Sequence, residues 1–260
     1  MAITYVNSGT PNAGTVGNII TPSFPPSTVS GNLLLNVVMC KFATRSINTE
    51  TGWTARGNTS GGAGTDGTTD EGQVRIGCFT KEATGAESGT MNQTFSSGTP
   101  NMSFARMVQF SRGGSSWNIG TAATAAVNAG GSTSLSFVFN TDPGISSGDV
   151  LAVAVALNTD NYTISSPAVS ASGCTITGHA TSTAFSNGQT EGSDARIALY
   201  LFDCTSGTSS GVATFTCTTS GNATNNPAGA AILLRLRQDG AGGSTIAPIS
   251  SGYHLRGFNR

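Results

Sequence analysis

The chain of 260 residues carries one pattern of strand-like segments twice. An apolar run at 31–40 opens with Gly-Asn, and a similar run at 148–157 opens with Gly-Asp. Two further blocks follow each run in the same order, while the offset between the copies grows from 117 to 126 positions: 75–79 corresponds to 196–200, and 105–110 corresponds to 231–236. A slowly growing offset is expected if insertions fall in loops between matched strands. We therefore predict two copies of one domain, at 1–115 and 116–238, followed by a C-terminal arm at 239–260.

Both copies have the pattern of short strands joined by turns. The chain contains 35 glycines and only 10% charged residues, and no stretch has apolar residues at helical spacing between caps. The sequence thus predicts an all-β fold of two tandem antiparallel β-sandwiches, either jelly-roll-like or of a related Greek-key topology, which the pattern does not separate. We expect Trp53 to anchor a following strand, because one large buried ring can organise the core of a small sandwich. The Gly/Thr-rich segment 58–72 predicts a long exposed loop.

The repeated apolar runs have no polar face. Alternate residues of a strand point to opposite sides of a sheet, and in 150–157 both sets are apolar. A strand with one face in water alternates apolar and polar residues instead. A loop, the other domain or another subunit must therefore cover the second face. This pattern leads us to expect a homo-oligomer, such as a trimer, or many copies on a symmetric lattice.

Composition argues against several classes of partner. The net charge is −1, the only lysines are Lys41 and Lys81, and the arginines form no basic stripe, so we expect no nucleic acid as partner. No apolar run reaches the roughly 18 residues of a membrane helix, and the first residues do not resemble a secretory signal. We expect the five cysteines to be reduced packing residues; the alternative is a bridge between Cys204 and either Cys174 or Cys217.

No catalytic or metal-binding motif is apparent, so we expect no enzymatic activity, no cofactor and no metal. The two histidines, His179 and His254, stand alone, and His179 lies in an expected loop. The acidic segments 66–71 and 191–194 offer carboxylates that can ligate calcium. Solvated loop charge is the simpler interpretation of these segments, and calcium remains the alternative.

Two positions in each copy are candidates for an interface. Arg75 and Phe79 lie on one face of their expected strand, as do Arg196 and Tyr200 in the second copy. The opposite face of each strand is apolar and predicted to be core. Arg and aromatic side chains are enriched at protein–protein interfaces, so each copy is expected to present this pair outward. The alternative is a surface cation–π pair or packing beneath a loop.

The C-terminal arm provides further interface candidates. After a Gly/Ser hinge it regains apolar and basic residues, among them Tyr253, Leu255, Arg256 and Phe258. Such residues gain by binding a groove or a sheet edge of a neighbouring subunit. The alternative is that the arm folds back over the apolar strand face of the second copy.

The order of these features resembles a known group of proteins. A Ser-Gly-Asn/Asp opening of an apolar strand, then Gly52-Trp53-Thr54, an Arg-containing strand and a closing apolar strand resemble the small β-sandwich proteins among the structural genes of tailed bacteriophages. The resemblance spans roughly residues 1–238, although the second copy has Ser165-Ser166-Pro167 where Gly-Trp-Thr is expected. It implies a virion protein made in the host cytoplasm, either a capsid decoration or cement protein or a tail-associated adaptor or fibre component. It implies no catalytic residues.

The partners implied are other virion proteins and copies of the chain itself, with no membrane. The alternative function is a glycan-binding module for receptor recognition on a virion or bacterial surface, because the 12 Phe, 4 Tyr and 2 Trp can supply the exposed rings that bind sugars. A secreted adhesin is a third option.

Overall fold

The computed structural model describes residues 2–14, 17–42, 44–65, 71–98, 100, 102–128, 133–159, 163–189, 194–220 and 227–239. Within these residues the chain is all β-structure. The first half contains β1 (Thr4–Ser8), β2 (Asn12–Gly14), β3 (Ile19–Ile20), β4 (Leu33–Lys41), β5 (Ser46–Ile47), β6 (Thr54–Ala63), β7 (Gly72–Glu82), β8 (Gln93–Ser96) and β9 (Met102–Ser111). The second contains β10 (Ser116–Ile119), β11 (Ala123–Val127), β12 (Ser134–Val138), β13 (Val150–Leu157), β14 (Thr163–Ala171), β15 (Cys174–Gln189), β16 (Ala195–Gly207), β17 (Ala213–Ser220) and β18 (Gly229–Asp239). The described residues include no helix long and apolar enough to cross a membrane.

The two halves have the same strand order. The first half forms a large sheet β1-β9-β4-β7-β6, with β2 also on β9, and a small sheet β3-β8-β5. The second half repeats this as β10-β18-β13-β16-β15, with β11 on β18, and β12-β17-β14. The order of the first four strands of each large sheet, facing its three-stranded partner, is that of a jelly roll. The predicted duplication is confirmed, because the repeated apolar runs become the central strands β4 and β13.

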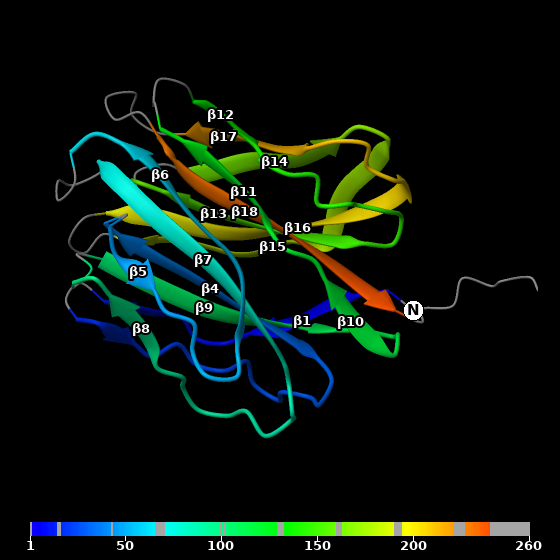
Figure 1. Ribbon diagram of the computed structural model, residues 1–260, viewed down its shortest axis with the longest axis horizontal. Coiled ribbons are helices and arrows are strands. Elements are labelled where there is room, and N and C mark those ends of the chain that lie inside the picture. Colours follow the sequence, from blue (N-terminus) through cyan, green and yellow to red (C-terminus); the bar gives the residue numbers. More distant parts are fainter. Residues whose placement is uncertain are drawn as a thin grey trace, which may run out of the picture.

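The four sheets form a stack of layers (Figure 1). One core lies between the large and small sheets of the first half and includes Leu34, Val38 and Trp53. A second core fills the corresponding space in the second half. A third core joins the halves, with Leu35 and Val37 on one side and Ala152 and Ala154 among the residues on the other. Of the covers considered for the second apolar face, the other half is therefore the one used.

Strand β6 of the first half lies against β11 and β18 of the second half, and glycines make this approach possible. A Cβ on Gly57 would lie 2.9 Å from the Cβ of Ala122, and a Cβ on Gly61 would lie 2.0 Å from the carbonyl oxygen of Gly229. Real Cβ atoms do not come this close to other atoms, so any larger residue requires movement of the backbone. The glycines of β6 thus set the distance between the halves.

Strand β15 of the second half lies against the first half, as β6 lies against the second. It makes this contact with a large aromatic ring. Phe185 of β15 packs against Phe104 of β9, with ring centroids 6.2 Å apart. The guanidinium carbon of Arg106 lies 5.4 Å from the centre of the Phe185 ring. The duplicated strands therefore occupy matching positions but use different side chains to hold the halves together.

Two local predictions from the sequence are wrong. In the segment expected to be a loop at 58–72, residues 58–63 belong to β6 and residue 72 begins β7, while residues 66–70 lie outside the described residues. The segment lacks apolar alternation because its glycines and small polar residues serve close packing instead. His179 lies within β15 and not in a loop. The placement of Trp53 in the first core is confirmed.

All five cysteines are free. Burial raises the pKa of the Cys40, Cys78 and Cys217 thiols to about 12, so these thiols are protonated at neutral pH. Neither of the considered bridges, from Cys204 to Cys174 or to Cys217, is formed. The cysteines act as small packing residues, as expected.

Candidate functional site

The aromatic members of the predicted interface pairs are buried. Phe79 is 3% exposed and lies in the core of the first half. Tyr200 is 2% exposed and stacks on Phe215 of the small sheet, with ring centroids 5.9 Å apart. The expectation that these rings face outward is wrong, because the small sheets cover this face of β7 and β16. The prediction that the opposite face is core is confirmed, since Ile76 and its neighbours fill the core between the halves.

The two arginines of these pairs lie half-buried at the same face. Arg75 donates a hydrogen bond to Asn58 Oδ1 at 3.0 Å, and Arg196 donates one to Ser186 Oγ at 3.3 Å. Each bond joins neighbouring strands of a large sheet, from β7 to β6 or from β16 to β15. Both arginines therefore contribute to sheet structure at equivalent positions.

The other predicted site residues belong to the C-terminal arm. Tyr253, Leu255, Arg256 and Phe258 of the C-terminal arm lie outside the described residues, as do residues 66–70 and 191–193 of the acidic segments. Across the ranges that the structure describes, no group of three or more His, Cys, Asp or Glu side chains is arranged to hold a metal ion.

His179 pairs with a carboxylate on the neighbouring strand. Its Nδ1 atom lies 2.7 Å from Asp203 Oδ1, linking β15 to β16. The imidazole is almost fully buried, whereas the carboxylate is partly exposed. The contact fixes the ring next to the edge of the large sheet.

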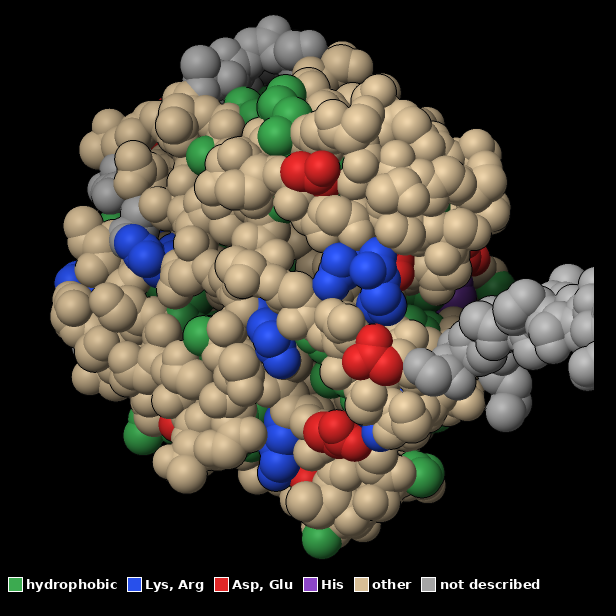
Figure 2. All heavy atoms as spheres, turned by 45° about the vertical axis from the view of Figure 1, so that its right-hand side comes forward, with side chains coloured by type: hydrophobic (Ala, Val, Ile, Leu, Met, Phe, Trp, Pro, Cys, Tyr) green, Lys and Arg blue, Asp and Glu red, His purple; other side chains and the backbone are tan. Residues whose placement is uncertain are grey.

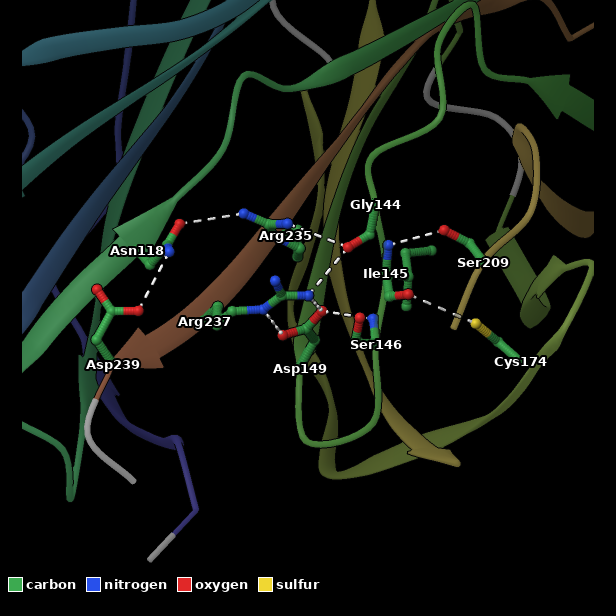
Figure 3. A network of polar contacts seen from close by, with 10 residues as sticks. All are labelled: Asn118, Gly144, Ile145, Ser146, Asp149, Cys174, Ser209, Arg235, Arg237 and Asp239. Atoms are coloured by element: carbon green, nitrogen blue, oxygen red, sulfur yellow. Dashed lines mark hydrogen bonds and ion pairs between the residues drawn. The ribbon is translucent and has the colours of Figure 1, made fainter. Parts of the chain in front are cut away.

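A second polar network fixes the turn that leads into β13 (Figure 3). Arg237 of β18 donates two hydrogen bonds of 2.7 Å to the carboxylate of Asp149, which is only 2% exposed. Asp149 also accepts a hydrogen bond from the Ser146 backbone N–H at 2.7 Å. Arg237 and Arg235 both donate to the Gly144 carbonyl oxygen. Since the charge of Arg237 is met by Asp149, this network has a structural role.

An open cleft lies where the two halves meet. Its volume is about 290 Å³, and β4, β6, β7 and β10 contribute its walls. The residues that line it include Leu33, Thr54, Arg56, Thr80, Glu82 and Trp117. Aromatic, cationic and hydroxyl side chains thus line one open cleft.

Arg56 brings a positive charge into this cleft. Its Nε donates to Thr80 Oγ1 at 2.6 Å, and its Nη1 donates to the Ile119 carbonyl oxygen at 3.1 Å. Burial lowers the pKa of the guanidinium from its ordinary value. None of the ion pairs within the described ranges involves Arg56. The cleft therefore contains a partly desolvated cation that no protein carboxylate balances.

Trp117 is held in one orientation beside Arg56. Its indole Nε1 donates a hydrogen bond of 2.8 Å to the Gly31 carbonyl oxygen of the first half. The guanidinium carbon of Arg112 lies 5.4 Å from the centre of the indole ring, and Arg112 in turn pairs with Glu82 at 2.8 Å. The Trp117 ring of the second half is thus fixed by two contacts from the first half before any ligand arrives.

Comparison with protein-family models, with curated proteins and with solved structures gave no significant match. The cleft was not predicted from the sequence. The only local signal is that Arg56 follows Gly52-Trp53-Thr54 closely, while Trp117 opens the second copy. These segments come together only through the packing of one half on the other.

Proposed function

We propose that this protein is a non-enzymatic structural protein of a tailed-bacteriophage virion that acts through protein–protein contacts. It serves as a capsid decoration or cement protein, or as a tail-associated adaptor or fibre component. The observation that carries the proposal is the four-layer stack of two jelly rolls with a shared core. Such a body offers strand edges and loops to its neighbours, as a building unit of a virion must.

The surface chemistry supports contacts of this kind. The face shown in Figure 2 consists mainly of uncharged polar side chains and backbone, with separate small patches of charge. The 16-residue strand β15 pairs with β16 along one edge, and no other described strand pairs with its second edge. A free edge offers backbone donors and acceptors to a neighbouring protein.

The proposal includes copies of the chain and other virion proteins as partners. The apolar strand faces that led us to expect a homo-oligomer are covered within the chain. Any self-association must then use edges and loops, and mass measurement in solution tests whether a trimer forms.

The direct test of the virion role is mass spectrometry of purified phage particles, followed by cryo-electron microscopy of the same particles. The proposal expects the chain in stoichiometric amounts and density for double jelly rolls on the head or the tail. Its absence from particles that contain the other structural proteins of that phage would overturn the proposal.

The second candidate function is glycan recognition, and the cleft with Trp117 and Arg56 favours it. Many sugar sites place an aromatic ring beside a few fixed hydrogen-bonding groups, because a sugar has both apolar C–H faces and hydroxyl edges. A glycan array probed with the isolated protein separates the two candidates. A specific saccharide signal favours recognition, and a blank array together with presence in virions favours a purely structural role.

A further inference from the structure

The cleft between the halves has a charge that needs an external counterpart. The positive charge of Arg56 is partly buried and, within the described part of the chain, unpaired by any carboxylate. Two of its nitrogens are used by Thr80 and Ile119, which hold the guanidinium plane in place. Nη2 has no part in these two bonds. A planar cation held in this way is suited to a carboxylate, since the two form strong charge-assisted hydrogen bonds.

The remaining charges of the cleft are already matched. Lys81 pairs with Glu87 at 3.0 Å, and Glu82 pairs with Arg112 at 2.8 Å. The cleft therefore has one uncompensated positive charge, which fits a ligand with one negative charge. Glu82, with its side chain 52% exposed at the rim, opposes a ligand that carries several.

The other residues that line the cleft indicate which kind of ligand carries the negative charge. Trp117 provides a fixed apolar ring, and Thr54 and Thr80 provide hydroxyl groups. A volume of about 290 Å³ lies just below the range for ligand sites, roughly 300–1,000 Å³. The cleft therefore suits one small unit that has an apolar face, several hydroxyl groups and one carboxylate.

We propose that this cleft binds an acidic sugar residue, a pyranose with one carboxylate, with the carboxylate on Arg56 and a C–H face of the sugar on Trp117. The inference rests on the glycan-recognition candidate and not on the virion role. Absence of the chain from virions would overturn the latter and leave this inference intact.

Binding can be followed at Trp117 itself. In ¹⁵N-labelled protein the two tryptophans give two indole N–H signals, and the variant Trp117→Phe assigns them. The probes are the methyl glycosides of glucuronic acid, galacturonic acid and N-acetylneuraminic acid, each added alone. Methyl glucoside and methyl galactoside are the neutral counterparts, and N-acetylglycine supplies a carboxylate without a sugar.

At least one acidic glycoside should shift the Trp117 signal in a saturable way. The neutral glycosides should bind with an affinity at least about tenfold lower, because they lack the charged hydrogen bond. Equal binding of neutral and acidic sugars, or no binding of any glycoside up to its solubility limit, overturns the proposal. So does N-acetylglycine binding as tightly as the best sugar, because the site would then recognise carboxylates of peptides.

Substitutions test the assigned roles. Arg56→Gln should reduce affinity for the acidic glycoside to the level of its neutral counterpart, and Arg56→Lys should retain part of the preference because it keeps the charge. Arg75→Gln makes the same charge change on the neighbouring strand β7, outside the cleft, and should bind like the unmodified chain. A folded Arg56→Gln protein that keeps the full preference overturns the assignment. If Arg56→Gln does not fold, Arg56→Lys decides: a preference for the acidic sugar that is retained at least in part supports recognition by charge, and a folded protein that has lost this preference contradicts it.

Discussion

Gly61 of β6 and Gly229 of β18 bring the backbones of the two halves into direct contact. A Cβ on Gly61 would lie 2.0 Å from the carbonyl oxygen of Gly229, far inside van der Waals distance. We expect Gly61→Ala to push β6 away from β18 and to destabilise the protein by about 1–3 kcal/mol, as overpacking does in other cores. Urea unfolding of the two proteins gives this difference.

Gly211→Ala is the matched control for this substitution. A Cβ there meets no atom within 4 Å, so the same chemical change should be close to neutral. Equal stability of the Gly61→Ala and Gly211→Ala proteins would show that the halves do not approach each other as described.

The ion pair between Arg237 and Asp149 predicts an asymmetric response to substitution. Asp149 is almost fully buried, whereas the Arg237 side chain is 30% exposed. Arg237→Leu leaves the buried carboxylate of Asp149 without its ion-pair partner. We expect the free energy of unfolding to fall by an amount near the lower end of the ~3–5 kcal/mol seen when buried pairs are broken. Asp149→Asn keeps an acceptor for the Ser146 N–H and leaves Arg237 able to reach water, so its cost should be smaller. The reverse order in thermal or urea unfolding would contradict this assignment.

The Glu87 carboxylate predicts acid sensitivity. It is partly desolvated, which raises its pKa, but hydrogen bonds from Thr84 and the ion pair with Lys81 outweigh this and lower the pKa from 4.5 to about 2. A lowered pKa in the folded state stabilises the protein above pH 4.5, and this contribution is lost as the pH falls from 4.5 towards 2. Glu87→Gln should therefore melt at a lower temperature at neutral pH and lose less on acidification than the unmodified chain.

Lys81→Met gives a graded comparison for Glu87. It removes one contact of Glu87 at 3.0 Å and leaves the Thr84 and Gly85 N–H donors in place. On acidification, the melting temperature of Lys81→Met should fall by less than that of the unmodified chain and by more than that of Glu87→Gln. Parallel pH profiles for all three would mean that Glu87 does not titrate as assigned.

The duplication and the sheet class were predictable because the central strands β4 and β13 are apolar apart from Asn36 and Lys41 of β4, a pattern that survives divergence. The buried positions of Phe79 and Tyr200 could not be predicted from the sequence. Both faces of β7 and β16 are covered, so the alternation of side chains no longer distinguishes a buried face from an exposed one. The part of β6 from residue 58 onward was missed because small polar residues and the glycines Gly61 and Gly62 stand where apolar side chains would mark a strand.

The cleft could not be predicted from the sequence, for a different reason. Arg56 and Trp117 belong to different halves, and neither lies in a motif that predicts a ligand. What makes them neighbours is the packing of one large sheet on the other, which places β10 beside β6 and the start of β4. Only the three-dimensional arrangement reveals that Arg56 is unbalanced in charge.

The C-terminal residues give a prediction about stability and assembly. One alternative for the arm was a cover for the apolar face of β13, but described residues of both halves fill the cores on the two sides of this strand. Deleting residues 244–260 should therefore leave the melting temperature nearly unchanged, while assembly or virion incorporation fails if the arm reaches a neighbour. A large drop in melting temperature with assembly intact would identify the arm as a cover.

The shared core between the halves is tested most directly by differential scanning calorimetry of the whole chain. If residues such as Val37 of β4 and Ala154 of β13 belong to one core, neither half can unfold alone without exposing the face of the other. We predict a single transition whose calorimetric enthalpy equals its van't Hoff enthalpy. Two resolved transitions, one for each half, would show that the jelly rolls are independent and would contradict the account.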